Sequence, residues 1–142
     1  AGDTWDSSVI LDAAGGSNLE IAVSTFFDEG DDSASGAEFV TGFKSWLNAD
    51  KTKLNNNGGN DIVAAVSALG YDAYMVAIEA IKAAGTTDSV KINEALWDVN
   101  YLGVTGNIAF DQTGDAIRDV AYIKSVNTLE KSWQFEAIQS IK

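Results

Sequence analysis

The chain has 142 residues, a length typical of one domain, with 21 acidic and 9 basic side chains and a net charge of −12. Such a charge repels phosphate backbones and anionic membrane surfaces, so we expect no nucleic-acid partner. The absence of cysteine and histidine excludes disulfides, thiol catalysis, Ser-His-Asp triads and zinc sites built from these residues. No apolar run has the length of a membrane span or a signal peptide, so we expect any export signal to lie outside these residues.

The beginning of the chain predicts a short helix, a strand and an acidic loop. Asp6 or Ser7 is suited to cap a helix that runs to about Ala14. Residues 21–27 are β-branched and aromatic, which is typical of a buried strand. Residues 28–36 are acidic and small, so they are predicted to form a loop.

A second helix is predicted to end near residue 49. Ser35 and Glu38 have the spacing of a capping box at its start. Apolar side chains follow at helical spacing: Phe39, Val40, Phe43, Trp46 and Leu47. Residues 51–59 are polar and contain the turn dipeptide Asn57-Gly58, so a loop is predicted there.

The strongest helical pattern of the chain comes next. Asn60 is suited to cap it and Gly85 to end it. Its predicted apolar stripe is Ile62, Val66, Leu69, Ala73, Val76, Ala77, Ala80 and Ala84. Asp88 is suited to cap a further helix, which carries Ile92, Ala95, Leu96 and Val99.

From Gly106 onward the pattern changes to that of strands joined by turns. Strands are predicted at residues 107–110, 117–126 and 133–138, with a turn at 111–114. Antiparallel hairpins are the natural arrangement for strands separated by such short turns.

Two acidic stretches suggest a cation site, but neither has the spacing of one. Residues 28–32 (DEGDD) lack the alternating ligands, the central glycine and the terminal glutamate of an EF-hand loop, and a solvated acidic loop explains them better. Residues 111–115 are explained by a hairpin turn. No spacing singles out a pair of carboxylates for catalysis, so we expect neither an enzyme, nor a metal, nor a cofactor.

The segment from Gly2 to Ser7 (GDTWDS) is the most interesting cluster, because it places a carboxylate and a large aromatic ring just before a helix. Asp3 could pair with an ammonium group, and Trp5 could form a wall for an apolar side chain. The structural alternative is a helix cap provided by Asp6 and a packed tryptophan. Chemistry alone favours that alternative.

Several segments together resemble the type I periplasmic (extracellular) solute-binding proteins of branched-chain amino-acid ABC transporters. The family has a loop of the form G-x-D/E-x-W-D-S, a helix with G-Y-D-A that ends in A-I-K-x-A-G, and a strand-and-turn signature. The matching segments here, in the family's order and spacing, are residues 2–7, 70–73, 80–85, 103–111 and 114–115.

The resemblance implies a fold in which two α/β lobes of Rossmann-like, three-layer type hold the solute between them. This chain would be the C-terminal portion, with both lobes incomplete and with C-terminal antiparallel hairpin strands. Residues 1 to about 28 would close the second lobe, about 29–105 would supply helices of the first lobe, and about 106–142 would form a crossing strand and the terminal hairpin. Helix faces left open in such a portion could lead to self-association.

The resemblance also implies a binding site. Asp3 would pair with the amino group of the ligand, and Thr4, Trp5 and Asp6 would lie at the cleft. Val66 matches a ligand-facing position where relatives often carry a larger apolar residue. Phe27 and Asp28 would lie at a hinge between the lobes, whereas Tyr71 and Asp72 would be structural.

The function that the resemblance implies is capture of a small branched-chain or other aliphatic amino acid outside the cell. The complex would be delivered to the membrane permease of an ABC importer. The protein would then be extracytoplasmic, either in the periplasm or lipid-anchored on the outer face of the cell membrane. Two alternatives stay open: a sensory receptor domain of the same fold, and a ligand that is an amide or a small organic acid.

Overall fold

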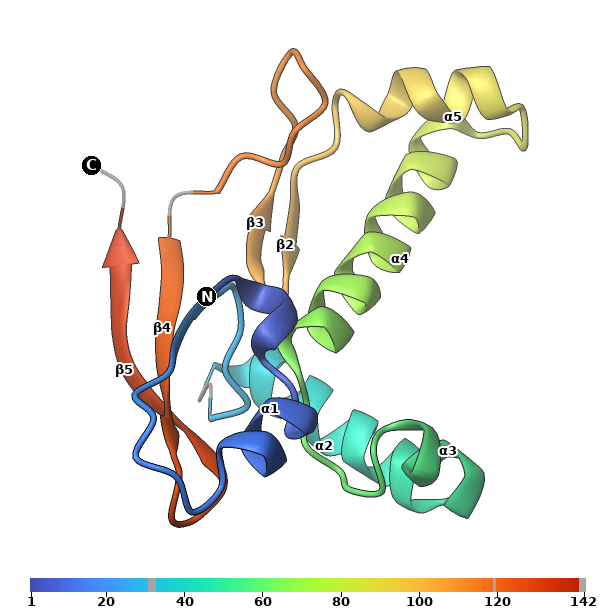
Figure 1. Ribbon diagram of the computed structural model, residues 1–142. Coiled ribbons are helices and arrows are strands. Elements are labelled where there is room, and N and C mark those ends of the chain that lie inside the picture. Colours follow the sequence, from blue (N-terminus) through green and yellow to red (C-terminus); the bar gives the residue numbers. More distant parts are fainter. Residues whose placement is uncertain (31–32, 119, 141–142) are drawn as a thin grey trace.

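The computed structural model describes residues 1–30, 33–118 and 120–140, which divide into a sheet region and a helical region (Figure 1). The sheet region contains a 3₁₀ turn η1 (Asp3–Trp5), helix α1 (Ser8–Ala14) and strands β1 (Ala22–Thr25), β4 (Val120–Asn127) and β5 (Ser132–Ser140). The helical region contains α2 (Ala34–Asn48), α3 (Lys51–Asn56), α4 (Ala65–Ala84), α5 (Ser89–Leu96) and the strands β2 (Tyr101–Gly103) and β3 (Gly106–Ile108). The sheet region therefore joins the two ends of the sequence, as Figure 1 shows.

The sheet has the order β1-β4-β5, and both pairings are antiparallel. Strands β4 and β5 confirm the predicted terminal hairpin, although β4 starts three residues later than expected and β5 is longer than expected. At the other edge, the Ala1 amino group donates to the Ala22 carbonyl (2.7 Å), and the Ala1 carbonyl accepts from Ser24 N (3.0 Å). Helix α1 covers one face of the sheet with the buried side chains of Leu11 and Ala14.

The helices at residues 34–56 differ from the prediction in two places. The cap of α2 is Ser33, whose hydroxyl accepts a hydrogen bond from Gly36 N (3.1 Å), so the predicted Ser35 capping box is wrong by two residues. The predicted loop at 51–59 contains α3, because the Asp50 carboxylate caps it by accepting from Thr52 N (2.8 Å). The sequence carries no sign of this helix because its residues are polar and none of them is buried, so it has no apolar stripe.

Helix α4 starts later than predicted and has a different buried face. Asn60 does not cap it; its side-chain oxygen instead accepts from Ile62 N (3.0 Å) in the preceding turn. The buried residues of α4 are Ala65, Ala68, Asp72, Val76 and Ala80, so the predicted stripe was right only at Val76 and Ala80. A buried carboxylate among alanines is the reason, because hydrophobic periodicity cannot register it. The predicted helix end at Gly85 and the predicted Asp88 cap of α5 are both confirmed.

Apolar side chains of the described residues form two clusters around α4. The first comprises Phe27, Phe39, Val63, Ala65, Ala68 and Val104. The second comprises Val76, Ala80, Val99 and Ile108. The lower half of α4 thus packs on α2 and on the segment that follows β1, whereas its upper half packs on the end of α5 and on the hairpin (Figure 1).

The hairpin of β2 and β3 is fastened to α4 by Asp72. This buried carboxylate accepts hydrogen bonds from Val104 N (2.9 Å), Thr105 N (2.8 Å) and Thr105 Oγ1 (2.7 Å). Gly103 lies so close that a Cβ atom there would be 2.4 Å from an Asp72 oxygen, so no larger residue fits without displacement. The sequence had predicted one strand at 107–110; the observed hairpin begins earlier, at Tyr101.

Among the described residues, no helix combines the length and apolarity needed to cross a membrane.

Candidate functional site

The loop at residues 2–7 forms the 3₁₀ turn η1 rather than an irregular segment. Trp5 N donates to the Gly2 carbonyl (3.1 Å), and Asp6 N donates to the Asp3 carbonyl (3.0 Å). Thr4 is exposed, and Trp5 keeps 47% of its surface exposed. Within the described part of the chain, no hydrogen bond or ion pair occupies the half-buried carboxylate of Asp3. The turn therefore presents a carboxylate without a partner beside an exposed aromatic ring.

Asp6, three residues later, has the opposite environment. Only 2% of the residue is exposed, and its two oxygens lie 3.0 and 3.2 Å from the Lys124 ammonium nitrogen. One of these oxygens also accepts a hydrogen bond from Ala65 N (3.0 Å), at the first turn of α4. Asp6 therefore acts as a link between η1, strand β4 and helix α4, and its carboxylate is fully occupied by these partners.

Val66 lies next to this link, because it directly follows Ala65 on α4. It is 49% exposed, and η1 contacts α4. The structure thus brings together the two parts of the sequence-predicted ligand set, the loop 2–7 and position 66. The link that joins them is the hydrogen bond from Ala65 N to Asp6.

The predicted hinge residues, Phe27 and Asp28, lie where the chain leaves β1 and passes to α2 (Figure 1). Phe27 is 1% exposed and meets Phe39 edge-on, with ring centroids 5.7 Å apart. The Asp28 carboxylate lies 3.3 Å from the Lys124 ammonium nitrogen and accepts from Gly30 N (2.9 Å). The segment that leaves β1 is therefore held by the Phe27–Phe39 ring contact and by the Asp28–Lys124 ion pair.

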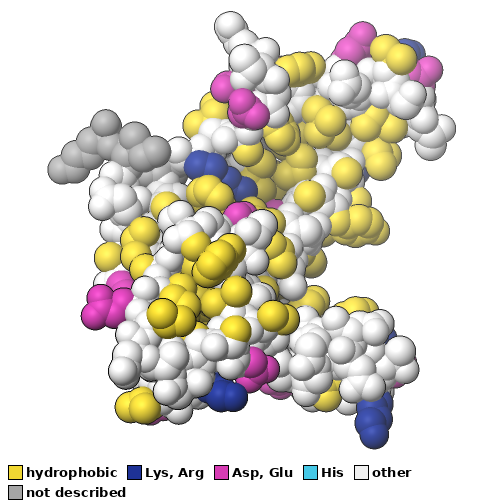
Figure 2. All heavy atoms as spheres, in the orientation of Figure 1, with side chains coloured by type: hydrophobic (Ala, Val, Ile, Leu, Met, Phe, Trp, Pro, Cys, Tyr) yellow, Lys and Arg dark blue, Asp and Glu magenta, His cyan; other side chains and the backbone are white. Residues whose placement is uncertain are grey.

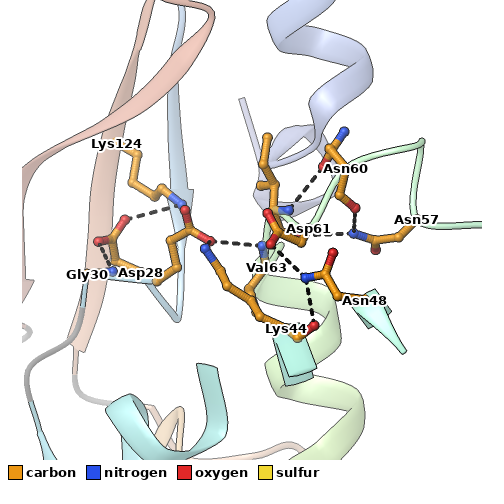
Figure 3. A network of polar contacts seen from close by, with 11 residues as sticks. Asp28, Gly30, Lys44, Asn48, Asn57, Asn60, Asp61, Val63 and Lys124 are labelled. Carbon is orange, nitrogen blue, oxygen red and sulfur yellow. Dashed lines mark hydrogen bonds and ion pairs between the residues drawn. The ribbon is translucent and has the colours of Figure 1, made fainter. Parts of the chain in front are cut away.

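Figure 3 shows the polar network that continues from this segment. Glu29 accepts a hydrogen bond from Val63 N (3.0 Å) and lies 3.3 Å from the Lys44 ammonium nitrogen. Asn48 donates to the Asp61 carboxylate (2.9 Å), which ties the end of α2 to the segment before α4. The segments 26–30 and 57–64 thus form one hydrogen-bonded unit at the base of α4.

Lys124 and Glu29 were not predicted to belong to the site. The alternation along β4 held a signal for Lys124, because it shares one face of the strand with Tyr122 and Val126. A lysine on the inward face of a strand requires a buried anion. Naming Asp6 as that anion from sequence was not feasible, since 118 residues separate the two.

The segment between β3 and β4 is fastened to the hairpin turn by Arg118. Its guanidinium group donates to the Thr105 carbonyl (2.8 Å) and to Thr105 Oγ1 (3.1 Å), and it lies 5.2 Å from the Phe26 ring centroid. Burial lowers the pKa of the Arg118 guanidinium, and the negative charge of Asp72 raises it in part. Burial, and next the charge of Asp72, raises the pKa of the nearby Tyr101 phenol above its ordinary value.

The largest cavity described lies away from these residues. It measures about 470 Å³ and is lined mainly by α2, Tyr71 and the hairpin, with the stacked rings of Phe39, Phe43 and Trp46 along one wall. None of the predicted ligand-binding residues lines it. Figure 2 shows further hydrophobic side chains in the hollow flanked by the hairpin and α4. We take the cluster at η1, and not this cavity, as the candidate site because it places a carboxylate without a partner among the described residues beside an exposed aromatic ring and next to the predicted ligand position Val66.

Among their described residues, the two acidic stretches do not gather the side chains that would hold a metal ion. Asp31 and Asp32 of the first stretch lie outside the described residues. In the second, the Asp111 carboxylate accepts from Thr113 N (2.8 Å), Thr113 Oγ1 (2.6 Å) and Asp115 N (3.1 Å), which is the predicted turn. Over the described ranges, no group of three potential metal-ligating side chains comes together.

Comparison with known proteins gives an informative match among solved structures. Neither a family model nor a curated protein sequence matches the chain. Among solved structures, the leucine-binding protein LivK from Thermotoga maritima is similar, with a TM-score of 0.76 and 30% sequence identity. The match covers 99% of this chain and 36% of LivK, so the chain spans about a third of the length of that protein. The predicted fold class is confirmed: this is a mixed α/β structure with antiparallel strands that matches a fragment of a periplasmic-binding-protein-like fold.

Proposed function

We propose that this chain is the C-terminal portion of an extracytoplasmic solute-binding protein, and that the protein captures a small branched-chain or other aliphatic amino acid. The observation that carries the proposal is the arrangement at η1. Asp3, whose carboxylate has no partner among the described residues, lies two residues before the exposed Trp5, and Asp6 directly after this turn accepts a hydrogen bond from Ala65 N at the start of α4. A leucine-binding protein with 30% identity over nearly the whole chain supports it.

The residues divide the recognition task between them. Asp3 accepts charge-assisted hydrogen bonds from the ligand ammonium group, which are about twice as strong as neutral ones. Trp5, Thr4 and Val66 border the ligand side chain. Valine leaves more room at position 66 than a larger apolar residue would, which favours a branched ligand over a small one. The ligand carboxylate is held by a part of the protein beyond these residues.

Binding, and not catalysis, is the proposed activity. In the proposed domain organisation, residues 1–28 complete one lobe, 29–105 belong to the other, and 106–142 cross back and end in the hairpin. Phe27 and Asp28 lie at one crossing, about which the lobes close on the ligand. The closed form is the one recognised by the membrane permease of an ABC importer, outside the cytoplasm.

Calorimetric titration of the full-length protein with each of the twenty amino acids tests this proposal. We expect one or a few aliphatic amino acids to bind. We expect Asp3→Asn to weaken that binding by roughly ten- to a hundredfold, because a hydrogen bond to a charged group is worth about 1.5–3 kcal/mol. The matched control is Asp12→Asn, which neutralises a carboxylate on α1 whose side chain is 74% exposed, and which should leave affinity unchanged.

A ligand series completes the design. An analogue with a hydroxyl group in place of the amine should bind wild type poorly, and should lose much less affinity than the amino acid when Asp3 becomes Asn. Equal losses for both ligands, or no binding of any amino acid, would overturn the assignment of Asp3 or of the solute class respectively.

A further inference from the structure

Lys124 is not one of the proposed ligand contacts, but it connects the residues that hold the candidate site together. Its side chain is 2% exposed, and its ammonium nitrogen lies 3.0 Å from Asp6 Oδ1 and 3.3 Å from Asp28 Oδ2. The Trp133 ring covers another side, with its centroid 5.8 Å away. One buried cation therefore joins three segments that are distant in sequence: the loop after η1, the crossing after β1, and strand β4.

The charges of this cluster do not cancel within the ion pairs alone, since two carboxylates face one ammonium group. The start of α4 supplies the balance. Its N-cap, Ala64, has no side chain able to cap the helix, and Ala65 N donates to Asp6 instead (3.0 Å). The positive end of a helix dipole, equivalent to about half an elementary charge, thus faces Asp6. Asp6 caps α4 from a different part of the chain.

This arrangement couples the position of η1 to Lys124. Asp6 directly follows the turn that carries Asp3 and Trp5, and Asp6 is the residue that holds this turn against Ala65 and Val66. Without the ammonium group, the buried Asp6 and the partly buried Asp28 would both lose their cation. Asp6 would be drawn toward water, and the turn would move with it.

We propose that Lys124 is a positioning residue for the amino-acid site: through Asp6 it fixes the distance between the Asp3–Trp5 turn and the first turn of α4. This inference rests on the proposed function for its consequence, ligand affinity, but its geometric part stands on the contacts of Lys124 alone. A misplacement of about 1 Å suffices to reduce recognition strongly in sites built for close fit.

The geometric part is tested without any ligand. The full-length protein is labelled with 5-fluorotryptophan, and the ¹⁹F resonance of Trp5 is assigned by its loss in Trp5→Phe. We expect Lys124→Met to shift or broaden the Trp5 resonance, and Lys131→Met to leave it in place. Lys131 is the matched control because it lies beside β5, is 53% exposed and pairs only with Asp12 among the described residues.

A second control separates positioning from loss of stability. Val76→Ala removes volume from the second apolar cluster, away from Lys124, so it should lower the melting temperature and leave the Trp5 resonance in place. If Lys124→Met does not fold, as judged by circular dichroism, Lys124→Gln replaces it under the same criterion. An unmoved Trp5 resonance in a folded Lys124 variant would overturn the proposal.

Affinity is the last measurement. With the amino acid found in the titration series, Lys124→Met should bind about tenfold or more weakly, while Lys131→Met and Val76→Ala bind as wild type does. A shifted Trp5 resonance with unchanged affinity would reject the positioning role. If no amino acid binds the wild type, the proposed function fails while the resonance result still decides the geometry.

Discussion

The molecule buries a carboxylate at each of two junctions, and it does so by two different means. At the junction of the sheet region with α4, Asp6 is paired with a cation, Lys124. At the junction of α4 with the hairpin, Asp72 accepts hydrogen bonds from neutral donors, Val104 N, Thr105 N and Thr105 Oγ1, and the Arg118 cation binds Thr105 rather than Asp72. Both aspartates are at most 2% exposed.

The difference shows what each junction requires. Asp72 joins residues about thirty positions apart through short, directional hydrogen bonds to one turn of the hairpin. Asp6 must hold segments 59 and 118 positions away, and an ammonium group can contact several carboxylates at once. Neutral donors give a fixed local geometry, whereas the buried cation joins several distant segments.

The largest effect is expected from removal of the cation. Lys124→Met leaves the buried Asp6 and the partly buried Asp28 without their shared cation, and breaking a buried ion pair in this way costs about 3–5 kcal/mol. The double variant Lys124→Met/Asp28→Asn should recover part of this loss, because it removes one of the stranded charges. Urea denaturation of wild type, the two single variants and the double variant measures the loss and its partial recovery. A double variant no more stable than Lys124→Met would show that the stranded charge is not the cause.

A smaller effect is expected at the neutral junction. Thr105→Val removes one of three donors to Asp72 and one acceptor of Arg118, while it keeps the shape of the side chain. The expected loss of stability is about 1–3 kcal/mol, the cost of leaving buried polar groups short of a partner. Denaturant midpoints of the variant and wild type give this value. A loss as large as that of Lys124→Met would contradict the proposed contrast between the junctions.

The smallest effect is expected at Asp111, which accepts from a threonine in the same way as Asp72 but at the surface. These hydrogen bonds, with the Thr113 side chain first, hold the pKa of Asp111 below its ordinary value. Since the folded-state pKa is depressed, the stability that they contribute is present above the unfolded-state pKa and is lost as pH falls through the folded-state pKa.

Thr113→Val should therefore raise the pKa of Asp111 toward that of an ordinary aspartate and leave the melting temperature at neutral pH nearly unchanged. Carboxyl carbon chemical shifts followed by NMR from pH 7 to 2 report this pKa. No change in it would mean that the backbone donors at residues 113–115 alone set the depression.

Local signals in the sequence predicted the parts of this structure that depend on neighbouring residues. The helix end at Gly85 and the Asp88 cap were predicted correctly because glycine and aspartate act within one turn. The start of α4 was not, since its cap is Asp6, a residue 59 positions earlier. The sequence did point to the loop at 2–7 and gave Asp3 the contact with the ligand amino group, but it left Asp6 either as a helix cap or as a residue at the cleft. Only the fold shows that one carboxylate is unoccupied and the other is enclosed.

The attachment of Asp6 at the base of α4 has a mechanical consequence. With 20 residues, α4 is about 30 Å long. A rotation of 10° about its first turn would move its far end by about 5 Å, given that length. Helix α5 and the hairpin would travel with it, because Val99 and Ile108 pack on Val76 and Ala80. A rotation of α4 that followed a small displacement of the Asp3–Trp5 turn would therefore be magnified at the far end of the helix.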